Sequence, residues 1–104
     1  MPFDTDLETY RVARDAAEAA MESARLAYKS ACTAYDNAIA DQRRTVHDAD
    51  PALRATATTK EAAIVTARTT MNNALSAYQS AITAFETARN AYDVFKSSIA
   101  TYVG

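Results

Sequence analysis

Small and large apolar residues recur at seven-residue intervals along most of this chain, and charged residues fall between them. The first half carries a row of alanines and a flanking row of larger side chains: Ala17, Ala24, Ala31 and Ala38, with Met21, Tyr28 and Tyr35. The second half repeats the arrangement: Ala67, Ala74, Ala81 and Ala88, with Ile64, Met71, Tyr78, Phe85, Tyr92 and Ile99. A seven-residue repeat is typical of helices that pack lengthwise as a left-handed coiled coil. We therefore predict an all-α protein built on an alanine-rich coiled coil.

The two halves are versions of one pattern. Residues 21–39 and 71–89 match at nine of nineteen positions, and Tyr35 in the first corresponds to Phe85 in the second. Ala has the highest intrinsic helix propensity. The chain has one Gly and two Pro, so few positions favour a turn. Two long helices are the expected result.

One internal segment, HDADP at residues 47–51, predicts the turn between them. Asp50 is a favourable N-cap, and Pro51 suits the first position of a helix because its missing N–H has no intrahelical partner there. Thr5 and Glu8 have the spacing of a capping box, which predicts a helix start near Thr5. The prediction is a single helical-hairpin domain over residues 1–104, with helix 1 at about 5–46, a turn at 47–50 and helix 2 at about 51–102. The Thr-rich segment 54–61 leaves open whether helix 2 is continuous there or breaks and restarts.

A second alanine row lies beside the first in each half, and the prediction places both rows in the seam between the helices. Its members are Ala13, Ala20, Ala27 and Ala34, with Ala63, Ala77, Ala84 and Ala91. Small side chains allow helix axes to approach closely. A third row adds Cys32, Ile39, Leu75 and Ile82 and widens the apolar arc beyond what one partner helix covers. We therefore expect the antiparallel two-helix hairpin to complete a helical bundle by oligomerisation, because two helices alone enclose little core.

The expected length difference between the helices points to the surface for that association. With a turn centred near residue 49, Met21 faces the Ala77–Tyr78 region and residues beyond about 95 have nothing opposite them. An exposed apolar end of this kind often marks an interface. The predicted interface residues are Tyr78, Phe85, Tyr92, Phe95, Ile99, Tyr102 and Val103.

Composition narrows the class of function. The net charge of −2 gives no general attraction to nucleic-acid polymers or acidic lipid, and no apolar run is long enough to span a membrane. The single Cys32 excludes an intrachain disulfide and a cysteine-based zinc site. The first ten residues lack the apolar core of a signal peptide, so we expect a cytoplasmic or virion-associated protein. No catalytic, cofactor or metal motif stands out, and we do not expect an enzyme.

Cations gather near the predicted turn and form the one candidate binding site. Arginine side chains match phosphate oxygens well, so a small anionic or nucleotide ligand could bind there, although neighbouring aspartates offset the charge. The residues are Arg43, Arg44, His47 and Arg54. The tyrosine row is a weaker candidate for base stacking, because residues 69–88 contain no Lys or Arg.

The length and the helix–turn–helix plan resemble the WXG-type hairpin proteins of bacterial type VII secretion systems. Those proteins carry Trp-x-Gly in the turn, whereas this chain has no Trp and its turn reads HDADP. The resemblance is one of shape and transfers no residue or function. The leading hypothesis is a non-enzymatic, self-associating hairpin that serves as a structural or adaptor component of a phage or bacterial assembly. The alternative is a small inhibitor or sequestering protein that binds a helical host protein, or an anionic ligand between protomers.

Overall fold

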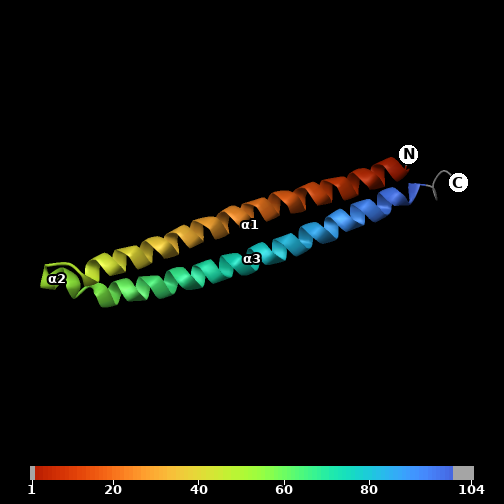
Figure 1. The fold of residues 1–104 in the computed structure, drawn as a ribbon. Helices are drawn as coiled ribbons and strands as arrows, with labels where there is room; N and C mark the ends of the chain where they lie inside the picture. The colour runs from red at the N-terminus through yellow and green to blue at the C-terminus, as the bar shows by residue number, and fades with distance from the viewer. Residues whose placement is uncertain (1, 100–104) are drawn as a thin grey trace. The chain divides into compact units, whose positions relative to one another are not determined.

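The computed structural model describes residues 2–99, and this part of the chain is helical with no strand (Figure 1). Helix α1 spans Pro2–Val46, α2 is the single turn Pro51–Arg54, and α3 spans Ala57–Ser97. The all-α prediction is therefore confirmed. The chain divides into two compact units: unit 1 joins residues 1–25 to 77–104, and unit 2 is residues 26–76. Each unit is described by itself below.

Unit 1 pairs the first part of α1 with the last part of α3, and these segments run side by side in opposite directions (Figure 1, red and blue). The Phe3 ring stacks on the Phe95 ring, and the Arg14 guanidinium lies over the Tyr92 ring. The residue numbers of the contacts thus increase along α1 as they decrease along α3, as expected for an antiparallel pair. The described part of α3 ends at Ser97, and the predicted continuation to residue 102 falls partly outside residues 2–99.

Helix α1 begins at Pro2 rather than near Thr5, so the predicted start was wrong. Thr5 lies inside the helix, where its carbonyl accepts a hydrogen bond from the Thr9 hydroxyl, and the Glu8 carboxylate binds Arg11 instead of capping. The physical reason lies in packing. Extending the helix by its first turn buries the Phe3 side chain, which is 4% exposed, and that gain outweighs a local cap signal.

Unit 2 contains the connection, and Asp50 caps α2 there as predicted. Helix α1 ends at Val46, and the Asp48 carboxylate accepts a hydrogen bond from the backbone N–H of Asp50 at 2.8 Å. Asp50 is extended, with φ −82° and ψ 117°, and its carboxylate accepts the N–H of Ala52 at 2.9 Å. Pro51 excludes the α conformation from the residue before it, so the chain turns and restarts at this point.

The question left open at residues 54–61 is answered by a break at residues 55 and 56, between α2 and α3. The Thr56 N–H donates to the carbonyl of Leu53 at 3.0 Å, and the Thr56 hydroxyl donates to the same oxygen at 2.6 Å. A threonine hydroxyl that competes for a backbone carbonyl weakens the regular helical ladder. The connection between the long helices therefore includes α2 as well as the predicted turn.

In each unit, the half-buried positions recur at three- and four-residue steps along both helices. In unit 1 they include Ala17, Met21 and Ala24 of α1, with Tyr78, Ala81, Phe85, Ala88 and Tyr92 of α3. In unit 2 they include Tyr28, Tyr35 and Ala38 of α1, with Ala67, Met71 and Ala74 of α3. Among the described residues, only Phe3 and Ala31 are buried, and neither is completely enclosed.

The second alanine row does not lie in the seam, which corrects the prediction of two alanine rows there. Ala13, Ala20, Ala27 and Ala34 are exposed, as are Ala63, Ala77 and Ala84, while Ala91 is half-buried. A pair of helices covers only two positions of each heptad, and here the second is filled by the larger residues. The third row of Cys32, Ile39, Leu75 and Ile82 is half-buried beside the seam.

The register of the pair also differs from the prediction. A turn centred near residue 49 places residue 38 opposite Lys60, whereas the Lys60 ammonium binds the carboxylate of Asp41 at 2.6 Å. The offset of nearly one helical turn arises because the break and α2 lengthen the connection. In unit 1, Phe95 stacks on both Phe3 and Tyr10, so it is level with a position between them. Two heptads further along both helices, Met21 is level with Ala81, which sets a large residue opposite a small one.

Candidate functional site

Three aromatic residues close the seam of unit 1 where the alanine rows end. The Phe3 and Phe95 ring centroids are 5.1 Å apart with planes 13° apart, and those of Tyr10 and Phe95 are 4.8 Å apart at 28°. These distances are typical of stacked rings, which attract beyond the area they bury. Phe95 is thus held between two rings of α1. The sequence predicted that residues beyond about 95 have nothing opposite them, and the structure shows that α1 covers Phe95 itself.

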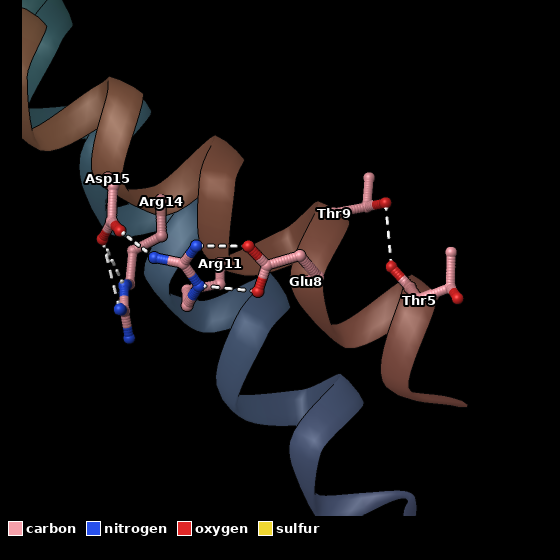
Figure 2. Close-up of polar contacts among 6 residues, drawn as sticks. All are labelled: Thr5, Glu8, Thr9, Arg11, Arg14 and Asp15. Carbon is pink, nitrogen blue, oxygen red and sulfur yellow. Dashed lines mark hydrogen bonds and ion pairs between the residues drawn. The ribbon is translucent and has the colours of Figure 1, made fainter. Parts of the chain in front are cut away.

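A ladder of charged side chains continues from this stack along α1 (Figure 2). Arg11 binds both oxygens of the Glu8 carboxylate through Nε and Nη2 and donates from Nη1 to Asp15 at 2.8 Å. The other Asp15 oxygen accepts two hydrogen bonds from Arg14 at 3.2 Å. The Arg14 guanidinium carbon lies 4.4 Å from the centroid of the Tyr92 ring in α3, so the ladder reaches the second helix through a cation–π contact.

The electrostatics of this ladder favour its charged form. The hydrogen bond from Arg11 lowers the pKa of the Glu8 carboxyl, and the same hydrogen bond raises the pKa of Arg11. Both side chains are about half-exposed. Because solvent screens a half-exposed pair of this kind, the ion pair of Glu8 with Arg11 contributes little to stability.

The stack and the ladder were not predicted from the sequence, although the heptad pattern contains their signal. Extending the row of Ala17 backward in steps of seven reaches Tyr10 and Phe3, and the row of Met21 reaches Arg14. Extending the row of Ala88 forward reaches Phe95. The rows of alanine end where larger residues take the same heptad positions.

The residues predicted as an intermolecular interface take part in packing within the chain. Tyr78, Phe85, Tyr92 and Phe95 are half-buried in the seam row or the stack, and the Arg89 guanidinium lies 5.9 Å from the Phe85 ring centroid. Ile99 is 50% exposed. Tyr102 and Val103 lie outside the described residues. Contact of this surface with a second copy stays a prediction.

Of the four residues predicted as an anion site, all in unit 2, Arg44 and Arg54 are engaged by other groups of the chain. The Arg54 guanidinium donates to the carbonyls of Asp48 and Ala49, at 3.0 and 3.2 Å, and so fastens the connection. Arg44 binds Asp41 at 3.3 Å, and that carboxylate also binds Lys60. The side chains of Arg43 and His47 are exposed. The Arg54 guanidinium therefore stabilises the backbone of the turn.

Asp41 is the residue of unit 2 whose charge joins the two long helices. The hydrogen bond from Lys60 lowers the pKa of its carboxyl, and Arg44 contributes in the same direction.

In the same unit, Cys32 is half-buried, and a hydrogen bond with its side chain raises the pKa of the Tyr28 hydroxyl. Within residues 2–99, no three His, Cys, Asp or Glu side chains gather as metal ligands would.

Along residues 9–23 and 77–94, one side of unit 1 carries no charge, although Asp6 lies one heptad before Ala13 on the same row; we call this stretch the uncharged flank. It comprises Thr9, Ala13, Ala16, Ala20 and Ser23 of α1, with Ala77, Ser80, Ala84, Thr87, Ala91 and Val94 of α3. In each helix, one row of the flank stands one residue before the large residues of the seam. In an antiparallel pair, such rows lie on the same side of both helices, so these residues lie together. All are exposed except the half-buried Ala91, and Val94 is 71% exposed. The charged residues of the same stretches lie in the seam or on other faces.

Comparison with protein-family models, with curated proteins and with solved structures finds no match to this chain. Across residues 2–99, no helix is both long enough and apolar enough to cross a membrane. The functional argument therefore depends on the surfaces described above.

Proposed function

We propose that this chain is a non-enzymatic, self-associating helical protein that serves as a structural or adaptor component of a larger assembly. In this proposal α1 and α3 form one antiparallel, alanine-rich coiled coil, and further copies complete a helical bundle around it. The phage or bacterial nature of the assembly stays a prediction from the sequence.

The observation that carries the proposal is the shortage of buried side chains. Only Phe3 and Ala31 are buried among the described residues, and no side chain there is fully enclosed. Several large apolar residues are about half-exposed or more: Val12, Leu26, Leu53, Val65, Val94 and Ile99. Apolar burial is the main favourable term in folding, at roughly 25 cal/mol per Å². A second copy would supply burial that a single chain of this kind lacks.

The uncharged flank is the surface that supports this role best. Interface cores are depleted of charged residues, and alanine or serine at a helix surface lets a neighbouring helix approach closely. One hydroxyl of this flank has a partner within the helix: that of Thr9 donates to the carbonyl of Thr5 at 3.1 Å. Burying such a hydroxyl costs less than burying one without a partner.

Sedimentation equilibrium of the wild-type protein at micromolar concentration tests the proposal directly. We expect a mass above that of one chain, which is 11.3 kDa, with helicity that falls as the complex dissociates on dilution. A stable, fully helical monomer across the concentration range would overturn self-association and favour a module that binds a different protein.

A matched pair of double variants tests which surface is used. Ala20→Lys with Ala84→Lys introduces two charges on the uncharged flank, whereas Ala19→Lys with Thr83→Lys places them one residue earlier, at exposed positions outside it. We expect the first double variant to sediment as a monomer and the second to retain the wild-type mass. Equal masses for both would show that association, if present, uses another surface, such as the predicted aromatic row.

The alternative, a sequestering protein that binds an anion through the cations of unit 2, has less support. Arg54 is held by two backbone carbonyls, and Arg44 and Lys60 share the carboxylate of Asp41. These cations therefore already bind groups of the chain itself, and a bound anion would have to compete with them.

A further inference from the structure

We draw no further inference here: the strongest candidate, the cluster of cations around the Tyr92 ring in unit 1, carries nothing because Glu8 and Asp15 already pair with its two α1 arginines and Lys96 lies only at the distant edge of the ring, 5.9 Å from its centroid.

Discussion

At the scale of single residues, the aromatic positions at the end of the seam carry more of the packing than the alanines between them. Phe3 is 4% exposed and Ala31 is 8% exposed, and the phenyl group is far larger. Phe3 also lies in the first turn of α1, where backbone N–H groups lack intrahelical acceptors. Its contact with Phe95 thus stabilises a helix end that would otherwise fray.

We expect Phe3→Ala to lower the free energy of unfolding by about 3 kcal/mol, the lower end of the range for truncating a buried Phe. The loss should concentrate at the first turns of α1 and the end of α3. A urea melt gives the global value, and amide hydrogen exchange locates the change. Val12→Ala, at a position that is 52% exposed, is the control and should change stability little. A Phe3→Ala protein as stable as the control would show that the stack contributes nothing.

Three carboxyl groups have lowered pKa values, and this gives stability a defined dependence on pH. The groups are Glu8, Glu22 and Asp41, each with a cationic partner as the main cause. A carboxyl with a lowered folded-state pKa contributes stability that is fully present above its ordinary value, about 4 for Asp and Glu, and is lost as the pH falls through the folded value. The melting temperature should therefore decline below about pH 4.

Asp41→Asn isolates the ion pair that joins the two helices. We expect its melting temperature to lie below that of the wild type at pH 7 and to converge with it as the pH falls through the lowered pKa of the wild-type carboxyl. Asp36→Asn changes an exposed carboxyl on the same helix and is the control. Thermal melts followed by circular dichroism at several pH values measure this. A gap that persists at the lowest pH would show that Asp41 acts through packing and not through its charge.

At the scale of the helices, size alternates across the seam. By the register of unit 1, Met21 of one helix falls level with Ala81 of the other, which sets a large side chain opposite a small one. The same alternation explains why one alanine row per helix is half-buried and the other is exposed. Bulk added to the buried row has no space to occupy, whereas bulk on the outer row does.

Leucine substitutions should test whether the seam row has space for a larger side chain. Ala31→Leu or Ala81→Leu should reduce stability by roughly 1–3 kcal/mol through overpacking. Ala40→Leu is the matched control, because Ala40 is exposed on the same helix as Ala31 and the residue types are identical. Thermal melts provide the comparison. Either seam variant melting at or above the wild type, with the control unchanged, would contradict a tight seam.

At the scale of the whole chain, the proposal links folding to association. If copies associate through the uncharged flank, dilution removes stabilisation along with the partner, and the melting temperature should rise with protein concentration. Melts over a hundredfold range of concentration measure this, with the Ala20→Lys, Ala84→Lys variant expected to show no dependence. Charged substitutions at Phe95 are less suited to the purpose, because they would disrupt the stack with Phe3 and Tyr10 within one chain. A wild-type melting temperature that is independent of concentration would argue for a monomer.

The sequence by itself determined the elements that depend on neighbours along the chain. The seven-residue repeat predicted two long helices, and Asp50 with Pro51 predicted the end of the first, because caps and proline act on the backbone within a few residues. The seam rows of Ala17 and Met21 were also readable, since a helix fixes which side chains share a face.

Only the tertiary structure decided what depends on the opposite helix. The start of α1 at Pro2 follows from the contact of Phe3 with Phe95, which overrides the cap signal at Thr5. The pairing of Asp41 with Lys60 follows from the length of the connection, which the break at residues 55 and 56 extends. The placement of the second alanine row outside the seam follows from competition between two equally periodic rows for one partner. Periodicity alone cannot rank such rows, because the ranking depends on how the side chains of both helices fit together.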